Sequence, residues 1–248
     1  MILGQVLLML QGEHKDGSFV EHLEELRWAI IRSLISVVVL FPLAFYFSDD
    51  LTALLVGRFC PPGLKLRYFS PVEPLLVQLK MAMYLAIIVA APYILKQVWG
   101  FVAPGLYLRE RRLAGGLLLA SCLLFIVGGA FAMILILPLV MSFSAGFQSA
   151  WLEPSIGFEQ FVNLTGLLAI SFGAMFQCPA AVFILIRTGI VSYEKLASLR
   201  AVIIVVIFIL SAILTPPDAV SQLLMGIPTW LLFELGLLLA RFAAPRGS

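Results

Sequence analysis

The stretch Gly105-Leu106-Tyr107-Leu108-Arg109-Glu110-Arg111-Arg112 lies between two long apolar runs, near residues 73–95 and 113–137. Apolar runs of this length are typical of transmembrane helices. Arginines in a short connection between two spans fix the orientation of the chain, so they need no further explanation. The stretch therefore predicts the connection between two membrane-spanning helices. Glu110 is the exception among these cations, and it suggests a carboxylate that binds a positively charged partner.

The composition extends this prediction to the whole chain. Of its 248 residues, 62% are hydrophobic and 12% are charged, and the mean hydropathy is +1.07. A soluble domain has about 25% charged residues and is about half apolar. We predict an all-α polytopic membrane protein, because the apolar runs are long enough for helices rather than for barrel strands.

Six apolar runs predict six transmembrane helices. They lie near residues 28–47, 73–95, 113–137, 161–186, 200–214 and 219–240. The fifth run would form only about 21 Å of helix, whereas the hydrocarbon core is ~30 Å thick. We expect a short span here rather than a re-entrant segment, and a hairpin of two short spans should thin the bilayer beside it.

The domain organisation predicted from these runs is simple. Residues 18–242 should form a single membrane domain. Residues 1–17 should form a cytoplasmic segment of open role, and residues 243–248 a cytoplasmic tail. The capping-box pattern Ser18-Phe19-Val20-Glu21 predicts that the first helix begins at Ser18.

Lysine and arginine are distributed unevenly between the loops. Eleven of the 16 fall on the side of the N-terminus, namely Lys15, Arg27, Lys96, Arg109, Arg111, Arg112, Arg187, Lys195, Arg200, Arg241 and Arg246. Arg58, Lys65 and Arg67 fall on the other side, and Arg32 and Lys80 lie within spans. The positive-inside rule then predicts that both termini lie in the cytoplasm, which agrees with an even number of spans.

Two segments on the opposite side, 48–72 and 138–160, are predicted to form an external cap. The first should begin with a short amphipathic helix over residues 49–56. Cys60 is the only cysteine predicted outside the membrane on that side, so no intrachain disulfide is obvious.

Lys80, Gln177, Gln222 and Glu234 are the polar residues that matter within the predicted membrane region. A charge in hydrocarbon costs ~2.5–3.5 kcal/mol on insertion scales, so each should face protein or water. Hydrogen bonding between helices is the simplest role for all four. For Gln177 and Gln222, binding of a partner helix is an equally open alternative.

The residues do not predict an enzyme. His14 and His22 are the only histidines, and no cysteine–histidine spacing or glycine-rich loop predicts a metal or cofactor site. Two carboxylates on the cytoplasmic side could instead each bind one guanidinium of an arginine pair. From the residues alone, capping explains Glu25 and a salt bridge within the loop explains Glu110.

Four sequence blocks add a family resemblance. They are His22-Leu23-Glu24-Glu25-Leu26-Arg27, Ser70-Pro71-Val72-Glu73-Pro74, Gln97-Val98-Trp99-Gly100-Phe101-Val102-Ala103-Pro104-Gly105-Leu106-Tyr107 continuing into Glu110-Arg111-Arg112, and Leu214-Thr215-Pro216-Pro217-Asp218 with Ser221-Gln222. In this order they resemble the motifs of TatC, the large subunit of the twin-arginine protein translocase. The likeness extends from about residue 18 to residue 242.

The resemblance implies a function in protein export. A TatC-like protein is a cup-shaped, six-helix protein of the bacterial or archaeal cytoplasmic membrane that recognises folded proteins with twin-arginine signal peptides. It acts with single-span TatA-type and TatB-type subunits under the proton-motive force and forms homo-oligomers within the receptor complex. No cofactor, metal or nucleic acid is implied.

The family's functional positions carry over residue by residue. Glu25, Glu110 and Arg27 match positions implicated in signal-peptide recognition, and Thr215, Asp218 and Gln222 match positions where partner helices dock. Gln177 departs from the family, which commonly has a glutamate there. A mechanism that needs a proton on this residue is therefore in doubt.

Two alternatives stay open at this point. A secondary transporter of a small solute would use Glu73, Lys80 and Glu234 along its pathway, but the sequence shows no repeat symmetry of the usual kind. A passive scaffold for other membrane proteins would bind no peptide.

Overall fold

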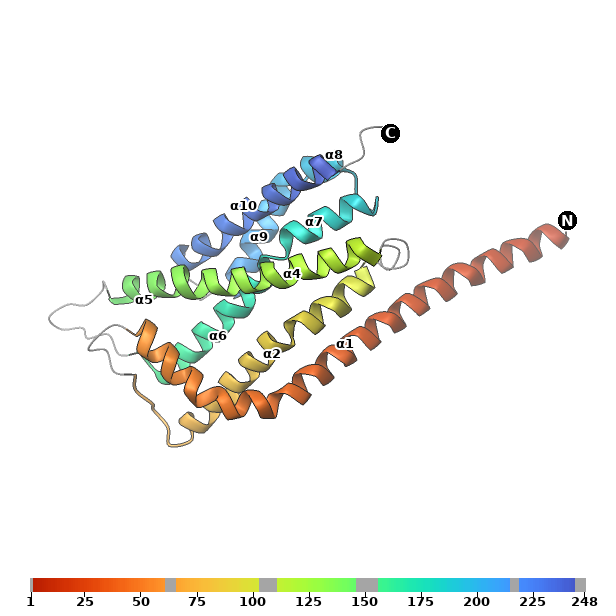
Figure 1. Ribbon diagram of the computed structural model, residues 1–248. Helices are drawn as coiled ribbons and strands as arrows, with labels where there is room; N and C mark the ends of the chain where they lie inside the picture. The colour runs from red at the N-terminus through yellow and green to blue at the C-terminus, as the bar shows by residue number, and fades with distance from the viewer. Residues whose placement is uncertain (1, 61–65, 103–110, 146–155, 215–218, 244–248) are drawn as a thin grey trace.

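The chain folds into a bundle of helices (Figure 1). This computed structural model describes residues 2–60, 66–102, 111–145, 156–214 and 219–243. Its helices are α1 (Ile2–Phe59), α2 (Glu73–Val102), α4 (Arg111–Phe131), the π-helix η1 (Ala132–Ile136), α5 (Leu137–Ala145), α6 (Phe158–Met175), α7 (Cys178–Arg187), α8 (Tyr193–Ser198), α9 (Arg200–Leu214) and α10 (Ala219–Ala243). Within the described ranges the fold is all-helical, as predicted, apart from one isolated bridge between Arg67 and Gly157.

Helix α1 differs from the prediction at both ends. It begins at Ile2 and not at Ser18, so the predicted helix start at the capping box is wrong. The residues before Ser18 include good helix formers, and nothing there forces the backbone to leave the helix. The expected amphipathic segment 49–56 is helical, but it continues α1 directly and is not a separate helix.

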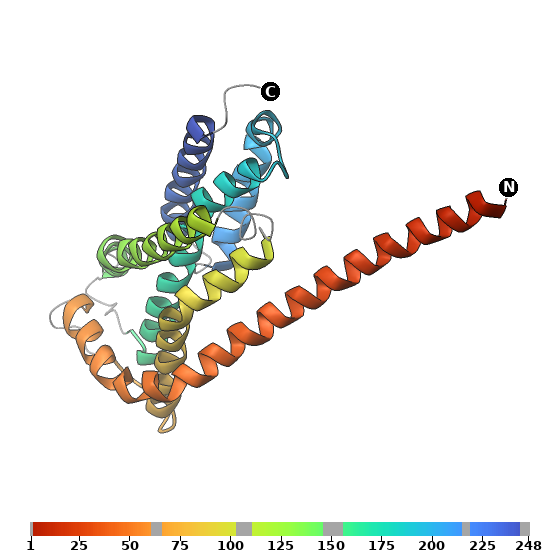
Figure 2. The same ribbon diagram turned by 45° about the vertical axis from the view of Figure 1, so that its right-hand side comes forward.

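The shape of α1 also stands out. Its N-terminal part projects away from the bundle, and its C-terminal part bends towards the other helices (Figures 1 and 2). Pro42 lies inside this helix. A proline removes one backbone hydrogen bond and clashes with the preceding turn, which accounts for a bend.

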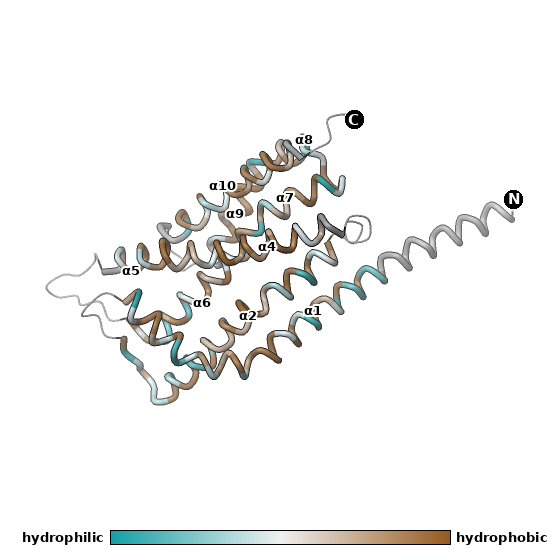
Figure 3. The backbone as a smooth tube through the Cα atoms, viewed as in Figure 1, coloured by the Kyte–Doolittle hydropathy of each residue, from teal (hydrophilic) through white to brown (hydrophobic). Residues whose placement is uncertain are grey.

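Within the described ranges, five helical segments are long and apolar enough to cross a membrane. They are Val20–Phe59, Glu73–Val102, Ala114–Phe143, Phe158–Arg187 and Gln222–Arg241. Helix α9 covers the same residues as the predicted fifth run, but its apolar part, Arg200–Ile213, is shorter than these five. Hydrophobic residues run along most of the described helices (Figure 3). Some of them face outwards, and Val38 on α1 is 69% exposed.

The main core is formed by α2, η1, α5 and α6, with Met225 of α10. Its fully buried side chains include Val77, Phe161, Leu168, Phe172 and Met225. Helix α1 packs along α2, α4 packs against α6, and α10 packs against α7. This arrangement places the C-terminal end of α2 beside α1, at the level of His22.

Two of the long segments are interrupted by local features with a clear cause. In the third, the backbone N–H of Leu137 donates to the carbonyl of Ala132, which makes a π turn just before Pro138. A proline cannot donate and crowds the preceding turn, so the wider turn accommodates it. In the fourth, the helix breaks at Phe176 and Gln177, and Pro179 lies in the first turn of α7.

The two segments of the predicted cap meet next to α6. The amide of Arg67 donates to the carbonyl of Ile156 at 3.1 Å, and the amide of Phe158 donates to the carbonyl of Arg67 at 2.8 Å. The described parts of the two connections are therefore tied together across almost ninety residues of sequence.

Candidate functional site

A groove of about 520 Å³ lies between α1 and the C-terminal end of α2. Its walls are formed by Glu21, Glu24, Glu25, Trp28, Ala29 and Arg32 of α1, and by Gln97, Gly100 and Phe101 of α2. The α1 residues recur mostly at spacings of three and four, which places them on one face of the helix. Three carboxylates thus share a groove at the end of the bundle that is predicted to be cytoplasmic.

Glu25 has a partner in the groove region. Its Oε2 lies 3.6 Å from Nδ1 of His22, and both side chains are more than half exposed. The imidazole of His22 also stacks on Phe101, with ring centroids 4.3 Å apart and planes at 17°. His22 therefore links the carboxylate of Glu25 to the aromatic ring at the end of α2. An exposed pair of this kind contributes little to stability, which leaves Glu25 available for a ligand.

The other two predicted recognition residues differ from Glu25. Arg27 is exposed on α1 and is not among the residues that line the groove. Glu110 lies outside the described residues, immediately before the start of α4 at Arg111. The groove thus brings together Glu25 and residues that the sequence did not single out for recognition.

Gln177 bridges two helices at the break between α6 and α7. Its amide nitrogen donates to the carbonyl of Ser121 on α4 at 3.1 Å and to the carbonyl of Gly173 at 3.3 Å. Its Oε1 is buried and accepts no hydrogen bond from the described residues. The side chain therefore acts as helix-to-helix glue through its nitrogen and retains an unused acceptor, so both alternatives left open by the sequence stay compatible with its geometry.

Gln222 has a simpler environment. Its amide nitrogen donates to the carbonyl of Phe208 at 3.0 Å, which ties α10 to α9. Thr215 and Asp218, the other predicted docking residues, lie outside the described residues. Gln222 therefore stabilises the packing of α10 against α9.

The charges near the start of α2 and α6 form a compact polar cluster. Glu73 is buried, and its two oxygens accept from the amides of Phe69 at 2.6 Å and Glu159 at 3.2 Å. Lys80 forms an ion pair with Glu159, and the hydroxyl of Tyr84 donates to Oδ1 of Asn163 at 3.3 Å. Glu73 thus caps the first turn of α6 and does not pair with Lys80. The role of Glu159 requires this tertiary contact and could not be read from the sequence.

A second ion pair lies at the opposite end of the bundle. Nε of Arg200 lies 2.9 Å from Oε1 of Glu234, and Nη2 donates to Oε2 at 3.1 Å, a forked contact between α9 and α10. Glu73, Lys80 and Glu234 therefore belong to two separate structural clusters. They do not line one pathway, as a solute transporter that used all three residues would require.

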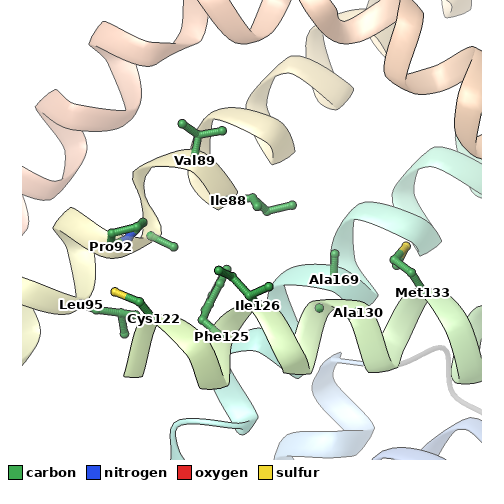
Figure 4. Close-up of a pocket in the computed structure, with 12 residues that line it drawn as sticks. Ile88, Val89, Pro92, Leu95, Cys122, Phe125, Ile126, Ala130, Met133 and Ala169 are labelled. Carbon is green, nitrogen blue, oxygen red and sulfur yellow. The ribbon is translucent and has the colours of Figure 1, made fainter. Parts of the chain in front are cut away.

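The large pocket near the middle of the bundle is apolar. Its volume is about 480 Å³, and it is lined by α2, α4, Met133 of η1 and Ala169 of α6 (Figure 4). The labelled side chains are Ile88, Val89, Pro92, Leu95, Cys122, Phe125, Ile126, Ala130, Met133 and Ala169. No carboxylate, amide or cation is among its lining residues, so this pocket offers no site for a polar solute.

The described residues contain no group of three or more histidines, cysteines or carboxylates arranged to hold a metal ion. Cys60, Cys122 and Cys178 form no disulfide with one another. The chemistry that the groove can perform is non-covalent: carboxylates and an amide that bind cations, beside aromatic walls.

Fold and groove together define a polytopic helical membrane protein with a carboxylate-lined groove between its first two long helices. The family model described as "Sec-independent protein translocase protein (TatC)" matches residues 21–228. The chain belongs to the TatC family.

Individual relatives agree with this assignment. The chain is 37% identical to the Sec-independent protein translocase protein TatC of Azotobacter chroococcum mcd 1, over 90% of this chain and 88% of that protein. It is 35% identical to the protein of the same name from Escherichia coli K12, over 92% and 90%. A crystal structure of the twin-arginine translocase receptor TatC aligns with a TM-score of 0.81 and 35% identity, covering 90% of this chain and 99% of that chain. The predicted family resemblance is confirmed.

Proposed function

We propose that this chain is the signal-peptide receptor and core subunit of a twin-arginine translocase. It binds Arg-Arg signal peptides of folded proteins at the cytoplasmic face of a bacterial or archaeal inner membrane, with both termini in the cytoplasm. Membership of the TatC family supports the transport role, and the eleven-to-three distribution of lysine and arginine in the loops supports the orientation. The proposed role is recognition and translocation, without catalysis.

The acidic groove between α1 and α2 is the observation that carries this proposal. A guanidinium donates two parallel hydrogen bonds to a carboxylate, and an arginine pair therefore needs two carboxylates. We assign one to Glu25, which lines the groove, and the other to Glu110, which follows the groove residue Phe101 by nine positions in the chain. Arg27 is proposed to support this site from the neighbouring face of α1.

Peptide binding tests the proposal directly. Detergent-purified protein is titrated with a labelled signal peptide carrying Arg-Arg and with the matched Lys-Lys peptide. Lysine keeps the charge and loses the forked geometry, so the wild-type protein should prefer Arg-Arg. Glu25→Gln and Glu110→Ala should each abolish this preference, whereas Glu194→Gln, at an exposed carboxylate on α8 away from the groove, should retain it. Equal binding of both peptides by the wild type would refute the proposal, and an absence of binding would favour a passive scaffold.

We further propose that Gln177, Thr215, Asp218 and Gln222 bind single-span TatA-type and TatB-type subunits, and that the chain forms homo-oligomers in the receptor complex. For Gln177, support comes from its place at the break between α6 and α7, where the residue is only half-buried. Export would then draw on the proton-motive force. Gln177→Leu should weaken copurification of a single-span partner while the protein still accumulates in the membrane. Unchanged copurification would leave Gln177 with the packing role that its nitrogen already performs.

A further inference from the structure

Trp28 lies in the middle of the acidic groove, between groups of opposite charge. Along α1 it follows Glu25 by three residues, Glu24 by four and Glu21 by seven, and it precedes Arg32 by four. All five side chains line the same groove. The charge of the α1 wall therefore changes sign along the groove, and the indole lies where the change occurs.

The geometry of a helix directs the indole towards the carboxylates. Long side chains on an α-helix lean back towards the N-terminus and cover the preceding turn. The turn that precedes Trp28 contains Glu24 and Glu25. A guanidinium bound by either carboxylate therefore lies within reach of the indole face, where a cation–π contact adds to the forked hydrogen bonds.

The indole is also accessible, in contrast to the other aromatic wall. Trp28 is 48% exposed, and no other described ring stacks on it. Phe101 already has His22 against one face. Trp28 thus offers an open aromatic face beside the carboxylates of the groove.

Arg32 limits the length of the cation-binding part of the groove. It lies about 6 Å further along the helix axis than Trp28, at ~1.5 Å rise per residue. Its positive charge repels a cation placed beyond the indole. A bound peptide is therefore oriented with its cations beside Glu21, Glu24 and Glu25 and its uncharged residues beside Arg32.

We propose that Trp28 is a specificity-determining residue of this receptor, a stacking platform that selects a planar guanidinium over an ammonium group. This inference rests on the proposed function, because it concerns the same groove and the same arginine pair. It assigns to the chain a second means of distinguishing arginine from lysine, independent of the carboxylate that accepts the fork.

The test compares Trp28→Leu with the wild-type protein on the Arg-Arg and Lys-Lys peptides. Leucine keeps an apolar side chain and removes the aromatic face. The dissociation constant for Arg-Arg should rise about two- to fivefold, as expected for one partly exposed cation–π contact, and that for Lys-Lys should change less. Trp28→Phe keeps a weaker aromatic face, so its dissociation constant for Arg-Arg should lie between those of the wild type and of Trp28→Leu. Ile30→Ala is the matched control, because Ile30 is equally exposed on α1 but does not line the groove.

The possible outcomes distinguish failure of the inference about Trp28 from failure of the proposed function. An equal loss for both peptides would show that Trp28 contributes only apolar contact area, and no change in Trp28→Leu would show that it contributes nothing; either result overturns the inference while the proposed function stands. A wild-type protein without preference for Arg-Arg overturns the proposed function and the inference with it. Where Trp28→Leu fails to accumulate, Trp28→Met, of similar length and also without an aromatic face, replaces it with the same expectations.

Discussion

The close crossing of α4 and α6 makes a quantitative prediction about two adjacent glycines. A Cβ built on Gly128 would lie 2.5 Å from the carbonyl oxygen of Phe172 and 2.8 Å from Cγ of Phe176. A Cβ on Gly129 would meet only the carbonyl oxygen of Ala169, at 3.7 Å. Both positions lie within α4, so Gly128→Ala and Gly129→Ala make the same chemical change in the same helix and differ only in what the new methyl group contacts.

The magnitude follows from this difference. Carbon contacts are favourable from about 3.5 Å, so at Gly128 the two backbones must separate by about 1 Å. Overpacking of this kind costs roughly 1–3 kcal/mol. Replacing a mid-helix glycine by alanine contributes about 0.5–1 kcal/mol of stability at either site, and this contribution cancels in the comparison. Gly128→Ala should therefore be less stable than Gly129→Ala by roughly 1–3 kcal/mol, and Gly129→Ala should equal or exceed the wild type.

Thermal unfolding in one detergent measures this difference. For a chain of this size, 1 kcal/mol shifts the Tm by about 2–4 °C. The hydrogen bond from Gln177 to the carbonyl of Ser121 crosses the same helix pair, so Gly128→Ala should also weaken it and reduce any partner binding that depends on Gln177. If both variants unfold at the same temperature, α4 and α6 do not approach each other as closely as the structure has them, and the account of Gln177 as a bridge loses its basis.

Three further predictions concern other parts of the chain. Glu73→Gln should destabilise the protein by about 1–3 kcal/mol, because glutamine has one acceptor oxygen for the two backbone N–H groups, of Phe69 and Glu159, that the buried carboxylate accepts from. Chemical unfolding measures it, and an unchanged midpoint would contradict the capping role. Arg200→Gln and Glu234→Gln should each cost no more than about 1 kcal/mol, since the pair is partly exposed, and the double variant should cost no more than either alone in a double-mutant cycle. Burial raises the pKa of the Cys60 thiol, so less thiolate is present at neutral pH. Labelling of this thiol by a membrane-impermeant maleimide from outside intact cells should therefore be slow at pH 7 and accelerate as the pH rises. Labelling only after permeabilisation would reverse the predicted orientation.

The sequence was sufficient for the all-helical fold class and for the family because both depend on local or linear information. Apolar runs report which segments can cross a membrane, and α9 occupies the same residues as the predicted fifth run. The capping pattern was less reliable, as the start of α1 at Ile2 shows. A capping box marks a place where a helix can begin, and it does not require the preceding residues to leave the helix.

The groove was harder to predict because two helices form it. The spacing of Glu21, Glu25, Trp28 and Arg32 on one face of α1 was present in the sequence, but it acquires meaning only when Gln97 and Phe101 of α2 lie opposite. In the same way, Glu73 and Lys80 lie seven residues apart, which places them on one face of α2. The actual partner of Lys80 is Glu159, 79 residues away, which no local pattern indicates.

The distribution of charge within the described spans bears on how export could be driven. Their carboxylates lie in the acidic groove at one end of α1, near its other end at Asp49 and Asp50, in the cluster of Glu73 and Glu159, and in the pair of Glu234 with Arg200. The break between α6 and α7 carries a neutral amide, Gln177, whose nitrogen is engaged and whose oxygen is buried. An amide cannot gain or release a proton at physiological pH. Position 177 therefore cannot carry the proton of a proton-driven step in this chain. Such a step acts on the other carboxylates or on groups supplied by the partner subunits, while Gln177 serves as a fixed hydrogen-bonding point between helices.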